Sequence, residues 1–258
     1  MFIPGCLFLY KENCMEPVLF YGVPQGCSFG SIVALEWLGE PYRLCRIEMM
    51  ERPWPAAYAK LNPRMLTPAL LTDDGAPLVE SLAILQHIGS RKLGAGIGFA
   101  QGTREFDRLN QMLSYLMTNF FFSFGPLWTV YETEGLTDAQ KDLLRRMGEE
   151  DVRNQCAYVD RVLAGSEWLL GNRKTVADAY MAGVARWAEY HRLFDMEAEY
   201  PHFARYLKTL RSDPAVRFAD AIEKGERARG NGSFKGHVAL DEVLDLAAAK
   251  RTPERVVS

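Results

Sequence analysis

Thr67-Pro68-Ala69-Leu70-Leu71 decides the fold of this 258-residue chain, together with Glu80-Ser81, which begins twelve residues after the proline. A proline in a strand must occupy the first residue or an edge, because it cannot donate to the hydrogen-bond ladder. An X-Pro bond is also the place where a cis peptide costs little. We therefore predict a cis Thr67–Pro68 bond that turns the Thr67 N–H and C=O out of the sheet, free to pair with another extended backbone.

Glu80 and Ser81 lie where a strand gives way to a helix. The apolar-periodic run Leu82–Ile88 predicts that helix, whose first N–H groups would face an incoming carboxylate. Together with Thr67, this arrangement predicts a site for a short acidic peptide. The alternative interpretation is a lone proline and an ordinary helix cap.

Short apolar runs broken by turn residues predict an α/β domain before residue 100. The elements follow in the order βαβ and then ββα, with Asp73-Asp74-Gly75 as the turn between the last two strands. This order implies a mixed four-stranded sheet with helices on its faces.

The pattern after residue 102 is helical throughout. Thr175 and Asp178 form a capping pair, and Pro201 and Pro214 occupy first-turn positions. We therefore divide the chain into an extension at 1–16, an α/β domain at 17–93, a glycine-rich linker at 94–102, an all-helical domain at 103–224 and a tail at 225–258.

The two ends of the chain carry separate predictions. Residues 1–16 hold an apolar run with no basic residue before it, which argues against a signal peptide. They are either a misplaced start, with Met15 as the true beginning, or an extra contact element. In the tail, Val238–Lys250 predicts a short amphipathic helix. Because such a helix is marginal alone, we expect it to dock on the helical domain or on a partner subunit.

Composition excludes several classes of protein. With 48% hydrophobic and 24% charged residues and a net charge of −3, the chain can bury a core and has no basic excess for nucleic acid. Its five cysteines are irregularly spaced, which argues against a metal site and a disulfide scaffold. No apolar run reaches the ~18–20 residues of a membrane helix. We expect a cytoplasmic protein without metal, nucleic acid or membrane contact.

Leu61–Leu70, followed by the glutamate and serine named above, resembles the glutathione-binding segment of the cytosolic glutathione transferase family. Leu19–Ser28 is similar to the first strand and catalytic loop of the bacterial, cysteine-bearing (beta-like) branch. Leu169–Asn172 and Thr175–Asp178 are similar to the helical-domain signature of the family. The resemblance implies a thioredoxin-like first domain, glutathione as co-substrate and a homodimer.

Cys27 lies at the first turn of a predicted helix, where the helix N-terminus lowers the pKa of a thiol toward neutrality. With the resemblance, this favours a catalytic Cys27 that forms a mixed disulfide with glutathione, over a small buried residue. Ser28 is a second candidate, as a hydroxyl that stabilises the glutathione thiolate or as a helix cap. Tyr21 is a third, or else a packed aromatic.

The resemblance also assigns contacts with glutathione. The assigned residues are Leu66, Thr67, Pro68, Glu80, Ser81 and Asn110. Asn110 would reach glutathione across the dimer, and Leu66 would offer backbone or apolar contacts. Beta-like relatives carry a His-Lys pair where this chain has Met117 and Thr118. Thr118 and Asn119 are the expected substitutes as hydrogen-bond donors.

Large aromatic side chains crowd residues 120–131 and cannot all face one way at 3.6 residues per turn. Some should line the cleft between the domains, which implies an apolar, aromatic electrophile as second substrate. The leading interpretation is a glutathione S-transferase that attacks such an electrophile, or exchanges thiols and disulfides through Cys27. The alternative is a non-catalytic glutathione-binding or regulatory protein of the same fold.

Overall fold

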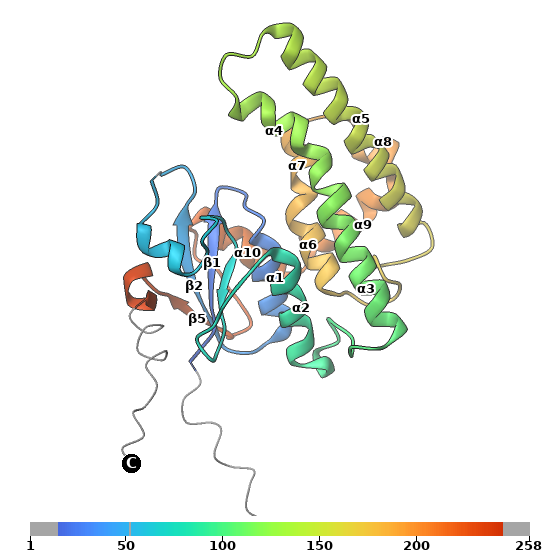
Figure 1. Cartoon of the computed structure of the whole chain (residues 1–258). Coiled ribbons are helices and arrows are strands. Elements are labelled where there is room, and N and C mark those ends of the chain that lie inside the picture. Colours follow the sequence, from blue (N-terminus) through green and yellow to red (C-terminus); the bar gives the residue numbers. More distant parts are fainter. Residues whose placement is uncertain (1–14, 52, 245–258) are drawn as a thin grey trace, which may run out of the picture.

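The computed structural model describes residues 15–51 and 53–244. A sheet with helices packed on it lies beside a larger group of helices (Figure 1). The five strands are β1 (Val18–Val23), β2 (Tyr42–Glu48), β3 (Ala69–Leu71), β4 (Pro77–Val79) and β5 (Phe234–His237). Their order in the sheet is β4-β3-β1-β2-β5, with β1 parallel to β2 and antiparallel to β3. All six residues of β1 are buried, as a central strand with both faces covered requires.

The predicted thioredoxin-like domain and helical domain are confirmed, but the prediction of four strands is wrong. The tail returns to the sheet, and β5 pairs in parallel with β2 through Tyr42 and Leu44. The segment has no alternating apolar pattern that would indicate a strand. It forms one because β2 offers an edge and because Phe234 packs its ring against Phe218 and Tyr42 at 5.5 and 5.8 Å between centroids.

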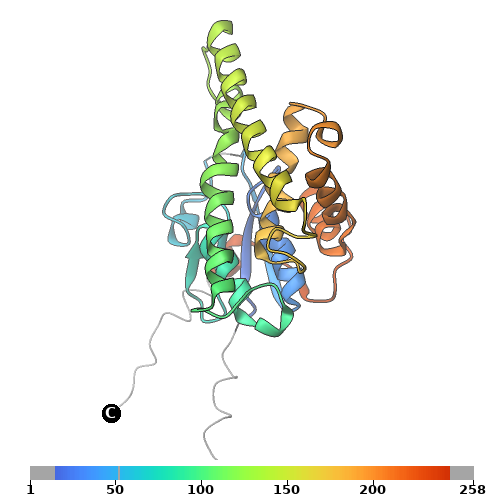
Figure 2. The same cartoon turned by 90° about the vertical axis from the view of Figure 1, so that its right-hand side faces the viewer.

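The helices of the first domain are α1 (Phe29–Leu38) and α2 (Ser81–Arg91), with short turns η1 (Ala56–Lys60) and η2 (Leu93–Ala95). The helices that follow are α3 (Arg104–Tyr115), α4 (Gly125–Glu132), α5 (Asp138–Leu163), α6 (Val176–Val184), α7 (Arg186–His191), α8 (Met196–Glu199), α9 (Pro201–Ser212) and α10 (Pro214–Lys224). In Figure 2, α4 and the first half of α5 form a pair whose upper end projects beyond the rest of the molecule.

The two domains approach most closely where α1 meets α6. A Cβ atom added at Gly30 would lie 2.7 Å from the Tyr180 Cα, so only glycine permits this approach. Asp178 of α6 is fully buried and accepts hydrogen bonds from the Thr175 N–H at 2.7 Å and the Tyr206 hydroxyl at 2.9 Å. The predicted capping pair is confirmed, and it fixes the start of the helix against which α1 packs.

The continuous helical pattern predicted from residue 103 to about 130 is interrupted. A π-helical segment η3 (Leu116–Phe120) and a 3-10 turn η4 (Phe122–Phe124) separate α3 from α4. Pro126 stands in the first turn of α4, where its missing N–H costs no hydrogen bond. The break redirects the aromatic side chains of this region, because each irregular turn rotates the residues that follow.

The described part of the predicted tail helix docks on the first domain and not on the helical domain, which was one of the two surfaces that we expected. Helical backbone begins at Leu240, and Val238 and Val243 are buried against the outer face of the sheet with Phe20 and Tyr58. The first domain therefore covers the apolar side of the described tail residues. Residues 245–250 of the predicted helix, and residues 1–14 of the predicted extension, lie outside the described residues.

Candidate functional site

The Thr67–Pro68 bond is cis, as predicted, and it places Thr67 at the end of β1. A Cβ atom on Gly22 would lie 2.3 Å from the Thr67 hydroxyl, so Thr67 closes directly over the strand end. The hydroxyl donates to the Met49 sulfur at 3.6 Å. Among the described residues, the Thr67 N–H and C=O form no hydrogen bond with other backbone groups. Both remain available to a second extended backbone.

Glu80 and Ser81 lie at the N-terminus of α2. Glu80 adopts φ 71°, a conformation that costs free energy for a residue with a side chain, and its carboxylate points outward to Arg64 Nη1 at 2.7 Å. The first intrahelical bond of α2 runs from the Ile84 N–H to the Glu80 C=O. The N–H groups of the three preceding residues therefore have no partner within the helix, and they form a site for an anion.

Cys27 lies in the loop between β1 and α1, but its surroundings do not favour the thiolate form. Burial raises the pKa of its thiol from 9.0 to about 12, which outweighs the lowering by a backbone N–H and by Arg186. The prediction of a lowered pKa is therefore wrong. Cys27 keeps partial exposure to solvent, and the partial charge of a helix end, worth about 1 kcal/mol, is less than the desolvation cost of a thiolate at this position.

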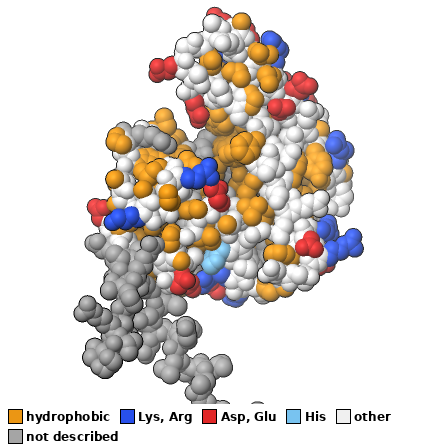
Figure 3. Space-filling view, in the orientation of Figure 1, with side chains coloured by type: hydrophobic (Ala, Val, Ile, Leu, Met, Phe, Trp, Pro, Cys, Tyr) orange, Lys and Arg blue, Asp and Glu red, His pale blue; other side chains and the backbone are white. Residues whose placement is uncertain are grey.

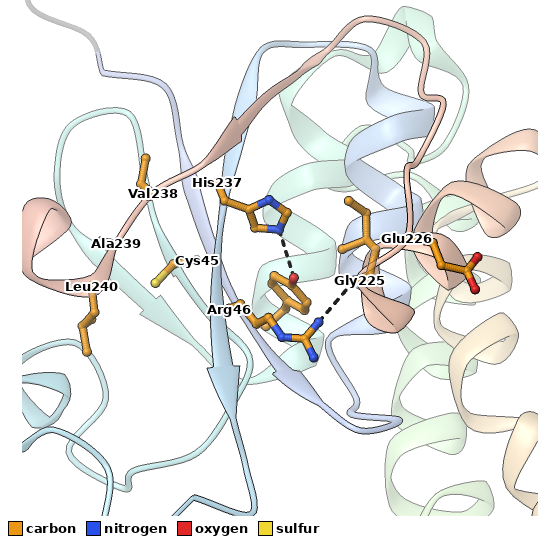
Figure 4. Close-up of a pocket in the computed structure, with 10 residues that line it drawn as sticks. Cys45, Arg46, Gly225, Glu226, His237, Val238, Ala239 and Leu240 are labelled. Atoms are coloured by element: carbon orange, nitrogen blue, oxygen red, sulfur yellow. Dashed lines mark hydrogen bonds between the residues drawn. The ribbon is translucent and has the colours of Figure 1, made fainter.

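Ser28 and Tyr21 are each engaged elsewhere. Ser28 is fully buried, and its hydroxyl oxygen accepts from the Gly22 N–H at 3.0 Å and does not cap α1. The Tyr21 hydroxyl lies 2.9 Å from the His237 Nε2 of the tail (Figure 4). Burial raises the pKa of Tyr21. Tyr21 and His237 line a cavity of about 490 Å³ between β2, the end of α10 and the tail, to which Cys27 and Thr67 do not contribute.

The other predicted site residues differ in exposure and in their hydrogen-bond partners. Leu66 is 44% exposed, and its carbonyl accepts from Tyr58 and Asn62 inside the domain. Asn110 of α3 accepts from Gln86 of α2, so it joins the two domains. Thr118 and Asn119 are exposed in η3, where the Thr118 hydroxyl contacts the Ser114 carbonyl and the Asn119 side chain at 2.8 Å each.

The aromatic residues divide between core and cleft. Phe120 and Phe124 are fully buried, whereas Phe122 and Tyr131 are 65% and 64% exposed. Figure 3 shows hydrophobic side chains in the hollow between the helical part and the sheet-bearing part.

Trp187 joins the aromatic groups of α4 and α7 to the loop between β1 and α1. Its ring lies 5.1 Å from Phe121 and 5.4 Å from Trp128, and its Nε1–H donates to the Gln25 carbonyl at 3.4 Å. Among the described residues, the Trp128 Nε1 and His191 Nε2 are buried without a hydrogen-bond partner. Burial lowers the pKa of His191, so this aromatic surface carries an uncharged imidazole.

Two kinds of structure are not found in the part of the chain that is described. Its His, Cys, Asp and Glu side chains form no group of three that would hold a metal ion. Within residues 15–244 apart from residue 52, no helix combines the length and the apolarity that a bilayer span requires.

Two family models match the chain, and together they span most of both domains. Residues 27–91 match the glutathione S-transferase N-terminal domain, and residues 127–214 match the glutathione S-transferase C-terminal domain. Glutathione S-transferase GstA of Escherichia coli O157:H7 is 30% identical over 211 residues, which is 80% of this chain and 98% of that protein. The chain belongs to the glutathione S-transferase family.

Solved structures of bacterial glutathione transferases share this arrangement. A sphingomonad glutathione S-transferase complexed with glutathione has a TM-score of 0.70 and 30% identity, over 80% of this chain and 98% of that one. A beta-class glutathione S-transferase from Sphingomonas chungbukensis has a TM-score of 0.69 and 29% identity, over 80% of this chain and 98% of that one. This chain covers 98% of each of these structures, whereas they cover 80% of this chain. About a fifth of this chain therefore has no counterpart in them.

Sequence reasoning missed several residues of this glutathione transferase site. Arg64 lies within the predicted binding segment and pairs with Glu80, sixteen residues on, which no local pattern indicates. Met49 and Trp187 lie outside every motif used, and only the fold brings them to Thr67 and Gln25. The same holds for His237, which lies beyond the family models and yet bonds Tyr21.

Proposed function

We propose that this chain transfers glutathione to an apolar, aromatic electrophile, with Thr67, Glu80 and Ser81 holding the tripeptide. The observation that carries the proposal is the pairing of an unsatisfied Thr67 backbone with the open N-terminus of α2 in a chain of this family. The Thr67 N–H and C=O would pair with the peptide backbone as an added strand does. The Ser81 hydroxyl and N–H groups would receive a carboxylate, and the Glu80 carboxylate would receive an ammonium group.

The state of Cys27 favours conjugation over thiol transfer. With its pKa raised to about 12, Cys27 is a thiol at neutral pH and is a poor nucleophile. Its S–H is then a hydrogen-bond donor that stabilises the thiolate of bound glutathione. Ser28 would act indirectly, because its bond to Gly22 holds the loop that carries the sulfur. Tyr21 contributes to the tail cavity and not to this step.

The second substrate would lie on the aromatic surface that Trp187 ties to the Gln25 carbonyl. Phe122, which is 65% exposed and packs 5.3 Å from Phe121, would offer ring surface to an aromatic electrophile. Because Thr118 and Asn119 are bonded to each other, they would assist by donating to glutathione only after separating.

The proposed active form is a cytoplasmic homodimer that uses the face of β4, α2 and α3. A hollow of about 560 Å³ on this face is lined in part by Leu78, Leu93, Phe99 and Phe106. Leu93 is 45% exposed in the single chain. A two-fold interface would cover this apolar surface on both copies at once. Light scattering should give about twice 29.2 kDa, and a mass of 29.2 kDa would exclude the dimer.

A thermal-shift titration with glutathione, followed by a conjugation assay with 1-chloro-2,4-dinitrobenzene, tests the proposal. We expect glutathione to raise the melting temperature and the mixture to give the dinitrophenyl conjugate. Mass spectrometry should find no stable glutathione adduct on Cys27. Binding without turnover on any aromatic electrophile would support a non-catalytic glutathione-binding protein, and an adduct on Cys27 would indicate thiol transfer.

A further inference from the structure

The Met49 side chain lies beside the residue that would hold the glutathione backbone. Met49 directly follows β2, and its N–H donates to the Val23 carbonyl at 2.9 Å, which ties it to the end of β1. Its side chain is partly exposed and packs against the apolar cluster on the outer face of the sheet. The backbone of this methionine is therefore fixed, while its side chain still meets solvent.

The Met49 sulfur, the Thr67 hydroxyl and Gly22 meet at the end of β1. A Cβ atom added at Gly22 would lie 2.3 Å from the Thr67 hydroxyl oxygen and 2.6 Å from the Met49 sulfur, so no further atom fits between the three groups. The 3.6 Å bond to this sulfur is the one side-chain hydrogen bond that Thr67 makes among the described residues. The sulfur therefore sets where Thr67 lies, and with it the direction of the unpaired Thr67 N–H and C=O.

The thioether is the group in this contact that a hydroperoxide alters. Oxidation converts a flexible, apolar methionine into a sulfoxide, which is polar and chiral. The sulfur lone pair attacks one peroxide oxygen, an S–O bond forms, and the O–O bond breaks. The second oxygen takes the peroxide proton and leaves as water or an alcohol. The methionine loses the two electrons that the hydroperoxide gains.

We propose that Met49 is a positioning residue for Thr67 and a site of oxidation by a hydroperoxide, so that sulfoxide formation at this sulfur weakens glutathione binding. This inference rests on the proposed role of Thr67 in holding the tripeptide. The added oxygen needs space beside Gly22 and the Thr67 hydroxyl, where the packing leaves none. Thr67 is displaced from the end of β1, and its N–H and C=O no longer face the peptide together.

The test is treatment of the full chain with hydrogen peroxide. Site-resolved mass spectrometry measures the sulfoxide at each methionine, and isothermal titration calorimetry measures the glutathione affinity. Dithiothreitol is applied and removed before the titration, because it reverses sulfenic acids and disulfides of cysteine but leaves methionine sulfoxide. We expect the affinity to fall about tenfold or more as Met49 is oxidised, since two backbone hydrogen bonds to the peptide are weakened. Methionine sulfoxide reductases A and B should restore it.

A kinetic measurement distinguishes a positioning role from a general loss of structure. In the conjugation assay, oxidation should raise KM for glutathione while kcat stays within about twofold of the untreated value. The reason is that Thr67 holds the peptide backbone and does not contact the reacting sulfur. An equal fall of kcat in all oxidised samples, with KM unchanged, would contradict the positioning role.

Two neighbouring methionines give a matched pair of variants. Met49→Leu removes the sulfur and should weaken glutathione binding about three- to tenfold before treatment, with no further loss after peroxide. Met50→Leu replaces a side chain that is 81% exposed, and this variant should lose affinity on oxidation as the wild type does. A loss on oxidation that persists in Met49→Leu would overturn the proposal, as would full affinity in a protein whose Met49 is oxidised.

Deuterium exchange separates a failure of this inference from a failure of the proposed function. Exchange in residues 66–71 should become faster after peroxide in the wild type and in Met50→Leu, but not in Met49→Leu. If the untreated protein does not bind glutathione, the proposed function fails, and the exchange measurement still decides whether Met49 holds Thr67. Equal exchange before and after oxidation of Met49 refutes the inference, and so does a Met49 that stays unoxidised while Met50 is converted.

Discussion

Thr67 and Cys27 lie on opposite sides of the proposed glutathione site. The two sides differ in how many of their polar groups are still free to contact a ligand. The Thr67 backbone has no backbone partner among the described residues, and the first N–H groups of α2 are open. On the other side, the Cys27 thiol is desolvated, the Ser28 hydroxyl bonds Gly22, and Tyr21 bonds His237. In the proposed site, peptide recognition would depend on backbone conformation, whereas reactivity would depend on burial and on neighbours from distant elements.

The tail belongs to the reactive side of this comparison. It bonds Tyr21 through His237, and its Asn231 N–H donates to the buried Glu36 carboxylate at 2.9 Å. Its end packs Val238 and Val243 under the sheet. No tail contact reaches Ser81 among the described residues. Changes to the tail should therefore affect the Cys27 side of the proposed site and leave glutathione recognition at Thr67 and Ser81 unchanged.

The largest expected effect comes from deletion of residues 226–258. Loss of the half-buried Phe234 side chain and of the buried Val238 and Val243 side chains should lower the free energy of unfolding by about 3–6 kcal/mol, as measured by urea denaturation. Glutathione affinity of the protein that remains folded should change by less than about threefold, because the α2 side is untouched. A large loss of glutathione affinity in a folded truncated chain would show that the tail also supports glutathione recognition, and would contradict this separation.

If the truncated chain does not fold, a milder substitution still tests the contribution of the tail to stability. Asn231→Ala removes two hydrogen bonds, one to the Glu36 carbonyl and one from the Ser233 N–H. It should cost about 1–2 kcal/mol in unfolding free energy, with exposed Asn172→Ala as the matched control. Equal stability of the two variants would contradict the role given to the tail.

The next effect concerns the ionisation of Cys27. Because its pKa is about 12 in the folded protein and 9.0 ordinarily, iodoacetamide should alkylate it about a hundredfold or more slower than a free thiol at pH 8. Its contribution to stability is fully present below pH 9 and is lost as the pH rises toward 12, since the unfolded chain releases the proton first. Cys27→Ala should therefore flatten the fall in melting temperature in that range. A Cys27 that titrates near pH 7 would refute this.

Ser81→Ala should weaken glutathione binding by about 1–3 kcal/mol, because it removes a charge-assisted contact at the start of α2. Isothermal titration calorimetry would measure the change. Ser90→Ala is the matched control at the other end of the same helix, where the hydroxyl bonds the His87 carbonyl. If both variants bind equally well, the carboxylate does not lie at Ser81.

The smallest effect is expected for Cys27→Ala. Glutathione binding should stay within about tenfold of the wild type, since one neutral contact is worth about 1 kcal/mol, while any glutathione adduct at this position disappears. A complete loss of binding in this variant, with none in Ser81→Ala, would reverse the roles given to the two sides.

The sequence alone determined the parts of this protein that depend on local backbone chemistry. Pro68 before an apolar strand predicted the cis bond, and the Thr175 and Asp178 spacing predicted the cap that α6 carries. The order of elements also predicted an α/β domain followed by a helical domain, and the family resemblance identified the first as thioredoxin-like. These features are set by residues close in sequence, so a linear pattern contains them.

The tertiary structure alone decided the electrostatics of the thiol, the fifth strand and the docking of the tail. Cys27 has the helix position of a reactive thiol, yet burial by residues from distant parts of the chain raises its pKa. β5 forms because β2 has a free edge, which no pattern in residues 234–237 indicates. Desolvation, ion pairing and strand addition depend on which distant groups become neighbours, and that is decided only when the chain packs.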